Sequence, residues 1–393
     1  MLDRRPRAPL PALRVLLALA LPAAADARQG AGGRPKPFVA TPLRVALQKM
    51  PVAKGSALPG FGVTAALPAE AFRAKVGANV VRFFDLDADG KLAVGTDGMA
   101  IDDAPFVVPI VAELLLRDGQ FQVAFDGTAT VVLAPEDLGP VRDLVSEAAV
   151  LTEMRMRAGL KPFALDLKCS AACRSHCDYV VGNGLLEGTI GISIHDEDPA
   201  RTGWTKEGAA AGTTSDLWPF ATSLEEALLV FYATVWHAVP IFDPAVERVG
   251  VAIVPKKLAM LGFVGIAPGK IDFAHPVDGA TGIPCEFNRN GEVPSPVPGR
   301  GNASGCGFPV LMRLSGKLGE LESAQLLDPK GRAVGGTSSS PENPANREWP
   351  TNSKCAAFVP SMPLLAGTTY HAVFKFKGAA EPVRWSFTTR KAK

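Results

Sequence analysis

Glycine and proline restrict the fold of this chain most, because they interrupt regular structure along its whole length. The 393 residues include 39 glycines and 34 prolines, and both residue types are unfavourable inside helices. This composition predicts many turns and long loops and argues against an all-helical bundle. Hydrophobic residues make up 47% of the chain and charged residues 20%, which is typical of a folded protein rather than a disordered one.

The first 27 residues have the three parts of an export signal. Four arginines precede an unbroken apolar run over residues 15–21, and Ala25-Asp26-Ala27 supplies small residues for cleavage before Arg28. The run is shorter than the roughly 20 residues that a membrane-spanning helix needs, and no later segment is long enough. The sequence therefore predicts a signal peptide over 1–27, a Gly-, Pro- and Arg-rich linker over 28–37, and a secreted, periplasmic or cell-envelope protein without a transmembrane segment in the mature chain.

The charge balance argues against a nucleic-acid partner. The whole chain has a formal net charge of +2, and residues 1–27 hold four arginines and two aspartates, so the rest of the chain is neutral. A protein that binds nucleic acid or anionic lipid as its main partner needs a basic surface.

Three regions with different patterns follow the linker. Residues 38–142 combine short apolar runs with Gly and Asp turns, which predicts a β-rich region. Residues 143–256 contain apolar residues at helical spacing, and we expect helices over 143–158, 171–181 and 224–236. Ser223, with Glu226 three residues later, forms a capping box for the third helix. Residues 268–393 return to short strands and turns and predict a β-sandwich, so the expected fold class is α+β.

Histidines and glutamates gather in the helical region. His176, His195 and His237 lie there, and Glu197 and Glu207 lie between the last two of them. Imidazoles and carboxylates together can form a ligand or metal site, whereas a single histidine is more often a hydrogen-bonded structural residue. Both interpretations stay open at this point, because residues that are close in sequence need not be close in space.

Several short segments of this region occur in an order that resembles one family. They are Arg157-Ala158-Gly159-Leu160-Lys161-Pro162-Phe163, Asp166, His176, Ile194-His195-Asp196-Glu197, Glu207-Gly208, Trp236-His237 and Val246-Glu247-Arg248-Val249-Gly250-Val251. Together they resemble the CAP superfamily of cysteine-rich secretory, antigen 5 and pathogenesis-related proteins, and especially its bacterial SCP-like extracellular members. The resemblance covers residues 146–254.

The resemblance implies an α/β/α sandwich with a shallow cleft. The floor of this cleft carries two histidines and two acidic residues that can hold a divalent metal. By the order of the motifs, His195 and His237 match the two histidines, and Glu207 matches the glutamate of a Gly-Glu-Asn step. Gly208 replaces the asparagine of that step, and Ala238 replaces an arginine frequent in bacterial members.

The fourth member of the set stays open. Glu197 lies two residues after His195, where an extended strand would point both side chains to one face. Glu226 fits a helix cap and lies eleven residues before His237, roughly 16 Å along a helix. His176 is an outer candidate.

The resemblance implies a non-enzymatic binding module for a lipid or protein, with a zinc-like metal as an expected cofactor. One alternative is a metal-dependent, peptidase-like hydrolase in which Glu207 or Glu197 acts as a general base toward bound water. Another alternative is an architectural envelope protein. Neither Gly-x-Ser-x-Gly nor His-Glu-x-x-His occurs in the sequence, so no catalytic residue is assigned.

An aspartate-rich segment over residues 85–97 resembles a calcium-binding loop. Asp85, Asp87 and Asp89 stand at its first, third and fifth positions, and Lys91 would supply the backbone carbonyl of the seventh. Thr96 stands at position twelve, where such loops have a bidentate glutamate. We therefore expect either a calcium site or an Asp-rich hairpin turn.

The six cysteines fall into two groups of three. Cys169, Cys173 and Cys177 are spaced four apart on one predicted helix, and Cys285, Cys306 and Cys355 lie in the C-terminal region. Export favours disulfides, and we expect a bridge between Cys285 and Cys306, which flank one loop. The outer helix cysteines lie about 12 Å apart, too far for one ion to bind all three. We expect helix cysteines to be buried as small hydrophobes or to tie the helix to the C-terminal region.

The C-terminal region resembles a bacterial Ig-like domain. The segment from His275 to Gly282 marks its start, and Trp385 and Phe387 alternate toward one face in its last strand. The step that ends in Tyr370 resembles a tyrosine corner, in which the hydroxyl holds the preceding turn. Such domains space or attach their neighbours, so no chemistry is assigned to this one.

Overall fold

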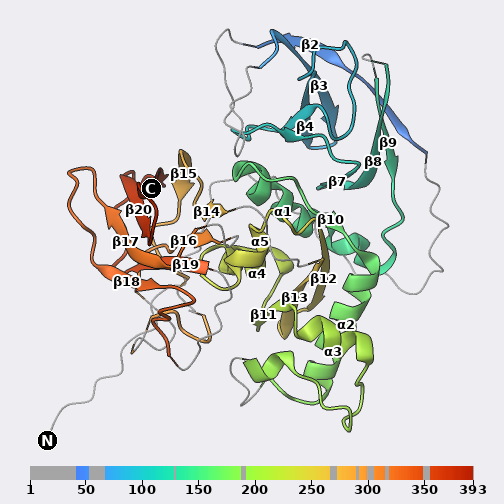
Figure 1. The fold of residues 1–393 in the computed structure, drawn as a ribbon. Helices are drawn as coiled ribbons and strands as arrows, with labels where there is room; N and C mark the ends of the chain where they lie inside the picture. Colours follow the sequence, from blue (N-terminus) through green and yellow to red (C-terminus); the bar gives the residue numbers. More distant parts are fainter. Residues whose placement is uncertain are drawn as a thin grey trace, which may run out of the picture. The chain divides into compact units, whose positions relative to one another are not determined.

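The computed structural model describes ten stretches of the chain. They are residues 41–52, 67–127, 130–186, 192–265, 272–288, 292–297, 299, 305–314, 318–347 and 355–392. The predicted signal peptide (1–27) and linker (28–37) lie outside the described residues. In the described part, helices and strands occur together and the strands form five sheets, which confirms the α+β class (Figure 1).

The strands before residue 136 form two antiparallel sheets. The first has the order β1 (Leu43–Ala46), β9 (Thr130–Pro135), β8 (Gly119–Asp126), β7 (Glu113–Leu116), and the second has the order β2 (Gln48–Pro51), β3 (Glu70–Val76), β4 (Asn79–Phe84), β5 (Gly98–Ile101), β6 (Val108–Pro109). One hydrophobic cluster takes side chains from both sheets. In β3, Ala74 and Val76 enter this cluster while Arg73 and Lys75 are exposed, as strand alternation requires.

The middle of the chain has one four-stranded sheet with helices around it. Its strand order is β10 (Ala164–Leu165), β12 (Arg248–Val254), β13 (Leu258–Val264), β11 (Ser215–Pro219). The helical elements are η1 (Gly139–Leu144), α1 (Val145–Arg157), α2 (Leu167–Gly182), η2 (Ile192–His195), α3 (Lys206–Gly212), α4 (Leu224–Tyr232) and α5 (Ala238–Ile241).

Alternate residues of this sheet belong to different cores. Val249 and Val251 join a cluster that contains residues of α1 and α4, whereas Ala252 and Met260 join a cluster that contains residues of α2. Because successive side chains of a strand point to opposite faces, α2 covers one face and α1 with α4 covers the other, as Figure 1 shows. Three layers of the order helix, sheet, helix result.

The helix boundaries differ from the sequence expectation for local reasons. The helix α2 begins at Leu167 because the Asp166 side chain caps it by accepting a hydrogen bond from Cys169 N. The helix α4 begins at Leu224, where the Ser223 hydroxyl accepts a hydrogen bond from Glu226 N, as predicted. It ends at Tyr232 instead of residue 236, and the N–H groups of Val235 and Trp236 bond to a side chain described below.

The C-terminal strands form two four-stranded sheets. Their orders are β14 (Phe273–His275), β16 (Val310–Arg313), β19 (Cys355–Pro360), β18 (Gly336–Ser339) and β15 (Ala280–Ile283), β21 (Val383–Thr389), β20 (Thr369–Phe376), β17 (Leu321–Leu327). Both sheets contribute side chains to one cluster, which includes Trp385 and Phe387. The Tyr370 hydroxyl accepts a hydrogen bond of 2.9 Å from Leu365 N, the contact expected of a tyrosine corner. Membership of an Ig-like family stays a prediction.

The expected disulfide is not formed. All six cysteines lie in the described residues, and none of them forms a disulfide. Phe308 N donates to Cys285 O, and Phe287 N donates to Cys306 O, so the two cysteines are diagonal neighbours across an antiparallel pair. Diagonal neighbours lie about 7–8 Å apart, whereas a disulfide needs Cβ atoms about 3.5–4.5 Å apart. Cys173 and Cys177 are fully buried, as expected for small hydrophobic residues.

Within the described residues, no helix is both long enough and apolar enough to span a membrane.

Candidate functional site

His195 ends η2 and is partly buried. Its Nδ1 lies 2.8 Å from the backbone carbonyl oxygen of Gly212, and a carbonyl can only accept, so Nδ1 carries the proton. Burial lowers the pKa of His195; the hydrogen bond to Gly212 opposes this, and the charges of His237 and His176 lower the pKa further. His195 is therefore a neutral imidazole that leaves Nε2 as a lone-pair donor.

His237 stands directly before α5 and is bound by a carboxylate from far along the chain. Its Nδ1 lies 2.7 Å from Oε1 of Glu292, whose side chain is completely buried. The same carboxylate accepts hydrogen bonds from the backbone N–H groups of Val235, Trp236 and His237 at 2.6–3.0 Å. Glu292 thereby fixes the orientation of the His237 ring through Nδ1 and does not bind Nε2.

A second acidic side chain, Asp216 of β11, affects the same histidine. Burial lowers the pKa of His237, but the hydrogen bond with Glu292 and the charges of Asp216 and Glu292 raise it above its ordinary value. Burial raises the pKa of Asp216 well above its usual range, and its Oδ2 is buried without a hydrogen-bond partner. His195, His237, Asp216 and Glu292 therefore share one electrostatic neighbourhood.

The structure pairs His176 and Glu197 with each other. The His176 Nδ1 lies 2.9 Å from Glu197 Oε1, and both side chains are completely buried. The His176 Nε2 lies 3.0 Å from Ile194 O, and the second oxygen of Glu197 accepts a hydrogen bond from Thr205 N. Both ring nitrogens of His176 therefore lie within hydrogen-bond distance of a protein oxygen. The pair therefore ties α2 to the segment that carries His195.

Glu207 lies in the first turn of α3 and is exposed. In the part of the chain that the structure describes, only one group of three or more His, Cys, Asp or Glu ligand atoms lies within 4.8 Å, and it is the aspartate segment near residue 85. The ligand atoms of His195, Glu207 and His237 do not gather to that distance. The structure thus brings the two histidines into one neighbourhood without a preassembled carboxylate ligand.

The aspartate segment forms a compact loop between β4 and β5. The carboxylates of Asp85, Asp87 and Asp89 have ligand atoms within 4.8 Å of one another, and Asp85 Oδ1 is buried without a hydrogen-bond partner. Asp97, next to position twelve, accepts hydrogen bonds from Leu86 N and Ala93 N at 2.8 and 2.7 Å. Asp97 therefore braces the loop instead of pointing its carboxylate to the other three. Calcium binding here stays a prediction.

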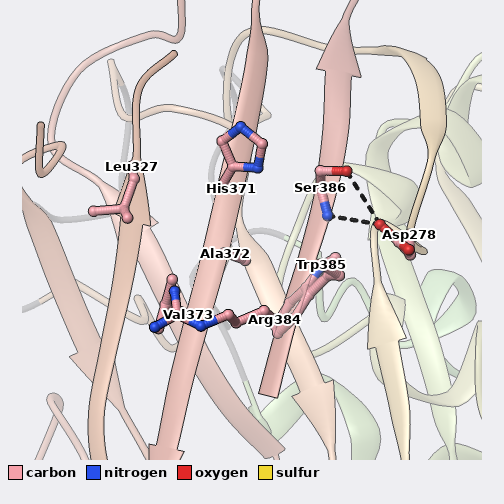
Figure 2. Close-up of a pocket in the computed structure, with 8 residues that line it drawn as sticks. All are labelled: Asp278, Leu327, His371, Ala372, Val373, Arg384, Trp385 and Ser386. Atoms are coloured by element: carbon pink, nitrogen blue, oxygen red, sulfur yellow. Dashed lines mark hydrogen bonds between the residues drawn. The ribbon is translucent and has the colours of Figure 1, made fainter. Parts of the chain in front are cut away.

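A surface pocket lies on the C-terminal sheet (Figure 2). Its walls come from β17, β20 and β21 and from the segment before β15, and the lining residues are Asp278, Leu327, His371, Ala372, Val373, Arg384, Trp385 and Ser386. Asp278 accepts hydrogen bonds from the backbone and hydroxyl of Ser386 at 2.8 and 3.1 Å. None of the predicted site residues lines this pocket.

Sequence reasoning missed both acidic neighbours of His237. Asp216 carried a usable signal, because it is a carboxylate within a strand whose next residues, Leu217 and Trp218, are apolar. Glu292 carried none, because it lies 55 residues after His237 in an irregular segment.

Comparisons with known proteins give no family assignment. No family model matches the chain, and no curated protein matches it. One similar solved structure is that of an extracellular protein containing an SCP domain from Bacillus anthracis str. Ames, with a TM-score of 0.25 and 13% sequence identity. The match covers 54% of this chain and 73% of the other. A TM-score this low does not assign the chain to a family.

Proposed function

We propose that this chain is an exported, CAP-like binding protein whose ligand binds at His195 and His237. One observation carries the proposal: each imidazole uses Nδ1 in a hydrogen bond to a protein oxygen, Gly212 O or Glu292 Oε1, and keeps Nε2 for a ligand. Proteins commonly present histidines to metals in this way, because the outer hydrogen bond sets the tautomer and ring orientation. The CAP-like assignment itself rests on the order of the sequence motifs.

A divalent ion such as Zn²⁺ fits these donors. Zn²⁺ prefers imidazole nitrogen and carboxylate oxygen, so we assign the two Nε2 atoms and the carboxylate of Glu207 as ligands. Glu207 is exposed, and its side chain can turn toward the histidines without disturbing a packed core. Glu197 is hydrogen-bonded to His176, and we assign it a supporting role instead. Metal binding at His237 releases a proton, because the ligand form is the neutral ring.

The test is a calorimetric Zn²⁺ titration of the full chain. We expect wild type to bind one ion and a His195→Ala/His237→Ala variant to lose that binding, while His371→Ala, in an exposed histidine of β20, binds as wild type does. Equal binding by wild type and the double variant contradicts the proposed site. Peptide hydrolysis by wild type that is lost when the metal is removed would support the hydrolase alternative instead of a binding function. Loss of stability in the double variant without any metal binding by wild type would support the architectural alternative.

A further inference from the structure

Cys169 and Cys173 of α2 lie next to two glycines of the sheet. Gly250 of β12 pairs directly with Gly262 of β13, and α2 covers this part of the sheet. A Cβ atom on Gly262 would lie 2.5 Å from Cys173 Sγ and 2.9 Å from Cys169 Sγ, and one on Gly250 would lie 2.7 Å from Cys169 Sγ. The separation of the two sulfur atoms therefore cannot exceed the sum of the first two distances, 5.4 Å.

The helical spacing of these two cysteines suits a bridging ion better than a disulfide. Residues four apart on a helix have Cβ atoms about 5–6 Å apart, and a disulfide needs about 3.5–4.5 Å. Two metal–thiolate bonds of about 2.3 Å span about 4.6 Å when they are collinear. The helix can therefore hold one ion between the two sulfur atoms while a disulfide would require it to deform.

The surroundings limit the ion to two protein ligands. Within the described residues, the two sulfur atoms belong to no group of three His, Cys, Asp or Glu ligand atoms that all lie within 4.8 Å of one another. The next thiol along the helix, Cys177, lies 3.9 Å from the sulfur of Met260 and is fully buried. Protein sites for Zn²⁺ supply three or four ligands, whereas Cu(I) is soft, prefers thiolate and accepts two.

We propose that Cys169 and Cys173 form a binding site for a single Cu(I) ion. Each thiol loses one proton, and the two thiolates and one cation give a complex with one negative charge. Cys169 is the third residue of α2, where the positive end of the helix dipole stabilises a thiolate. Cys169 is partly exposed and Cys173 is buried, so the ion enters past Cys169.

The site is tested with the reduced full chain under anaerobic conditions. Cu(I) is supplied as its complex with bicinchoninate, and loss of the colour of that complex measures transfer to the protein. We expect wild type to take one Cu(I) per chain and Cys169→Ser and Cys173→Ser each to bind at least 100-fold more weakly. Cys285→Ser, which changes a partly buried cysteine outside α2, should bind as wild type does. Equal competition by all four proteins, or none by wild type, overturns the proposal.

A second measurement needs no variant and is independent of folding defects. One equivalent of Cu(I) should protect Cys169 of wild type, the partly exposed thiol of the pair, from iodoacetamide, while Cys285 is alkylated at the same rate with and without the ion. Peptide mass spectrometry measures each site. Alkylation of Cys169 at an unchanged rate, or recovery of Cys169 and Cys173 as a disulfide from the reduced chain, overturns the proposal. Neither result depends on the histidine site.

Discussion

At the scale of single residues, Glu292 and Glu197 show how one side chain fixes a histidine. Each carboxylate is buried and lies within hydrogen-bond distance of a ring nitrogen, Glu292 of His237 and Glu197 of His176. The histidines could be singled out from sequence because they cluster among helices. Their partners could not be assigned, because hydrogen-bond pairing depends on which chain segments meet in space.

The variant Glu292→Gln should lower the pKa of His237, because it removes the negative charge that raises this pKa. In wild type, protonated His237 stabilises the folded state below its unfolded pKa of about 6.5, and this contribution is lost as the pH rises through the raised folded pKa. In the variant, this contribution to the stability of the folded state should be lost at a lower pH. NMR titration of the ring protons measures the shift, with Glu381→Gln, an exposed position, as the control. A His237 pKa equal in both variants contradicts the assignment.

The variant Glu197→Ala should lower the free energy of unfolding by about 1–3 kcal/mol, because it leaves the completely buried Nδ1 of His176 without its hydrogen-bond partner. Arg174→Ala, on the same helix, removes an ion pair to Asp178 whose side chains are more than half exposed, and exposed pairs contribute about 0–1 kcal/mol. Urea denaturation of both variants compares the two. Equal small losses would show that Glu197 does not form a buried hydrogen bond with His176.

At the scale of elements, local signals predict where a helix begins better than where it ends. Ser223 caps α4 through a hydrogen bond from Glu226 N, a contact within one turn that the sequence reveals. The end of α4 depends on Glu292, which binds the N–H groups of Val235 and Trp236. No pattern near residue 232 encodes this contact, so the helical periodicity overestimates the length of α4.

The contact between α2 and its sheet requires glycine. A Cβ atom on Gly250 would lie 2.5 Å from backbone atoms of Cys169 and Ser170, and overpacking of this kind costs about 1–3 kcal/mol. We expect Gly250→Ala to lower the free energy of unfolding by that amount. Gly182→Ala, where nothing lies within 4 Å, should be neutral or stabilising, since alanine is favoured in helices. Chemical denaturation measures both, and equal effects would contradict the close approach of α2.

The loop between β4 and β5 should bind Ca²⁺ weakly, with a Kd of about 10⁻⁴–10⁻³ M, the range of extracellular modules. Three carboxylates have ligand atoms within 4.8 Å, but no glutamate occupies position twelve. At 100 times Kd, binding should stabilise the fold by about 2.7 kcal/mol, which calorimetric melting measures. Asp87→Asn/Asp89→Asn should abolish the increase, and Asp118→Asn should retain it. An unchanged Tm with Ca²⁺ in wild type would support the Asp-rich turn.

At the scale of the whole molecule, the sequence pattern separates three regions, but the packing crosses between them. One hydrophobic cluster contains Phe106, Leu151 and Phe273 together with Val359 of β19. Periodicity reveals which residues of an element are buried, and it does not reveal against which element they pack. The α+β class was therefore predictable, whereas the dependence of the histidine site on C-terminal residues was not.

The C-terminal residues complete the middle region in two ways. Glu292 binds His237, and Arg313 of β16 forms an ion pair of 2.9 Å with Asp243, with both side chains less than one tenth exposed. Removing Arg313 leaves Asp243 as a buried charge without its counter-ion, and we expect Arg313→Ala to cost about 3–5 kcal/mol. Arg332→Ala, which removes an exposed arginine paired with Asp328, should change the stability little.

A chain that ends at Val264 should therefore fail to unfold cooperatively, because it lacks Glu292, Arg313 and the C-terminal part of the shared cluster. The full chain should show one thermal transition for the middle and C-terminal regions, since the buried ion pair and the cluster join them. Calorimetry of both chains, with near-ultraviolet circular dichroism to detect fixed aromatic packing, compares them. A truncated chain with a sharp transition and the Tm of the full chain would mean that residues 143–256 fold independently and that Glu292 does not hold His237 in place.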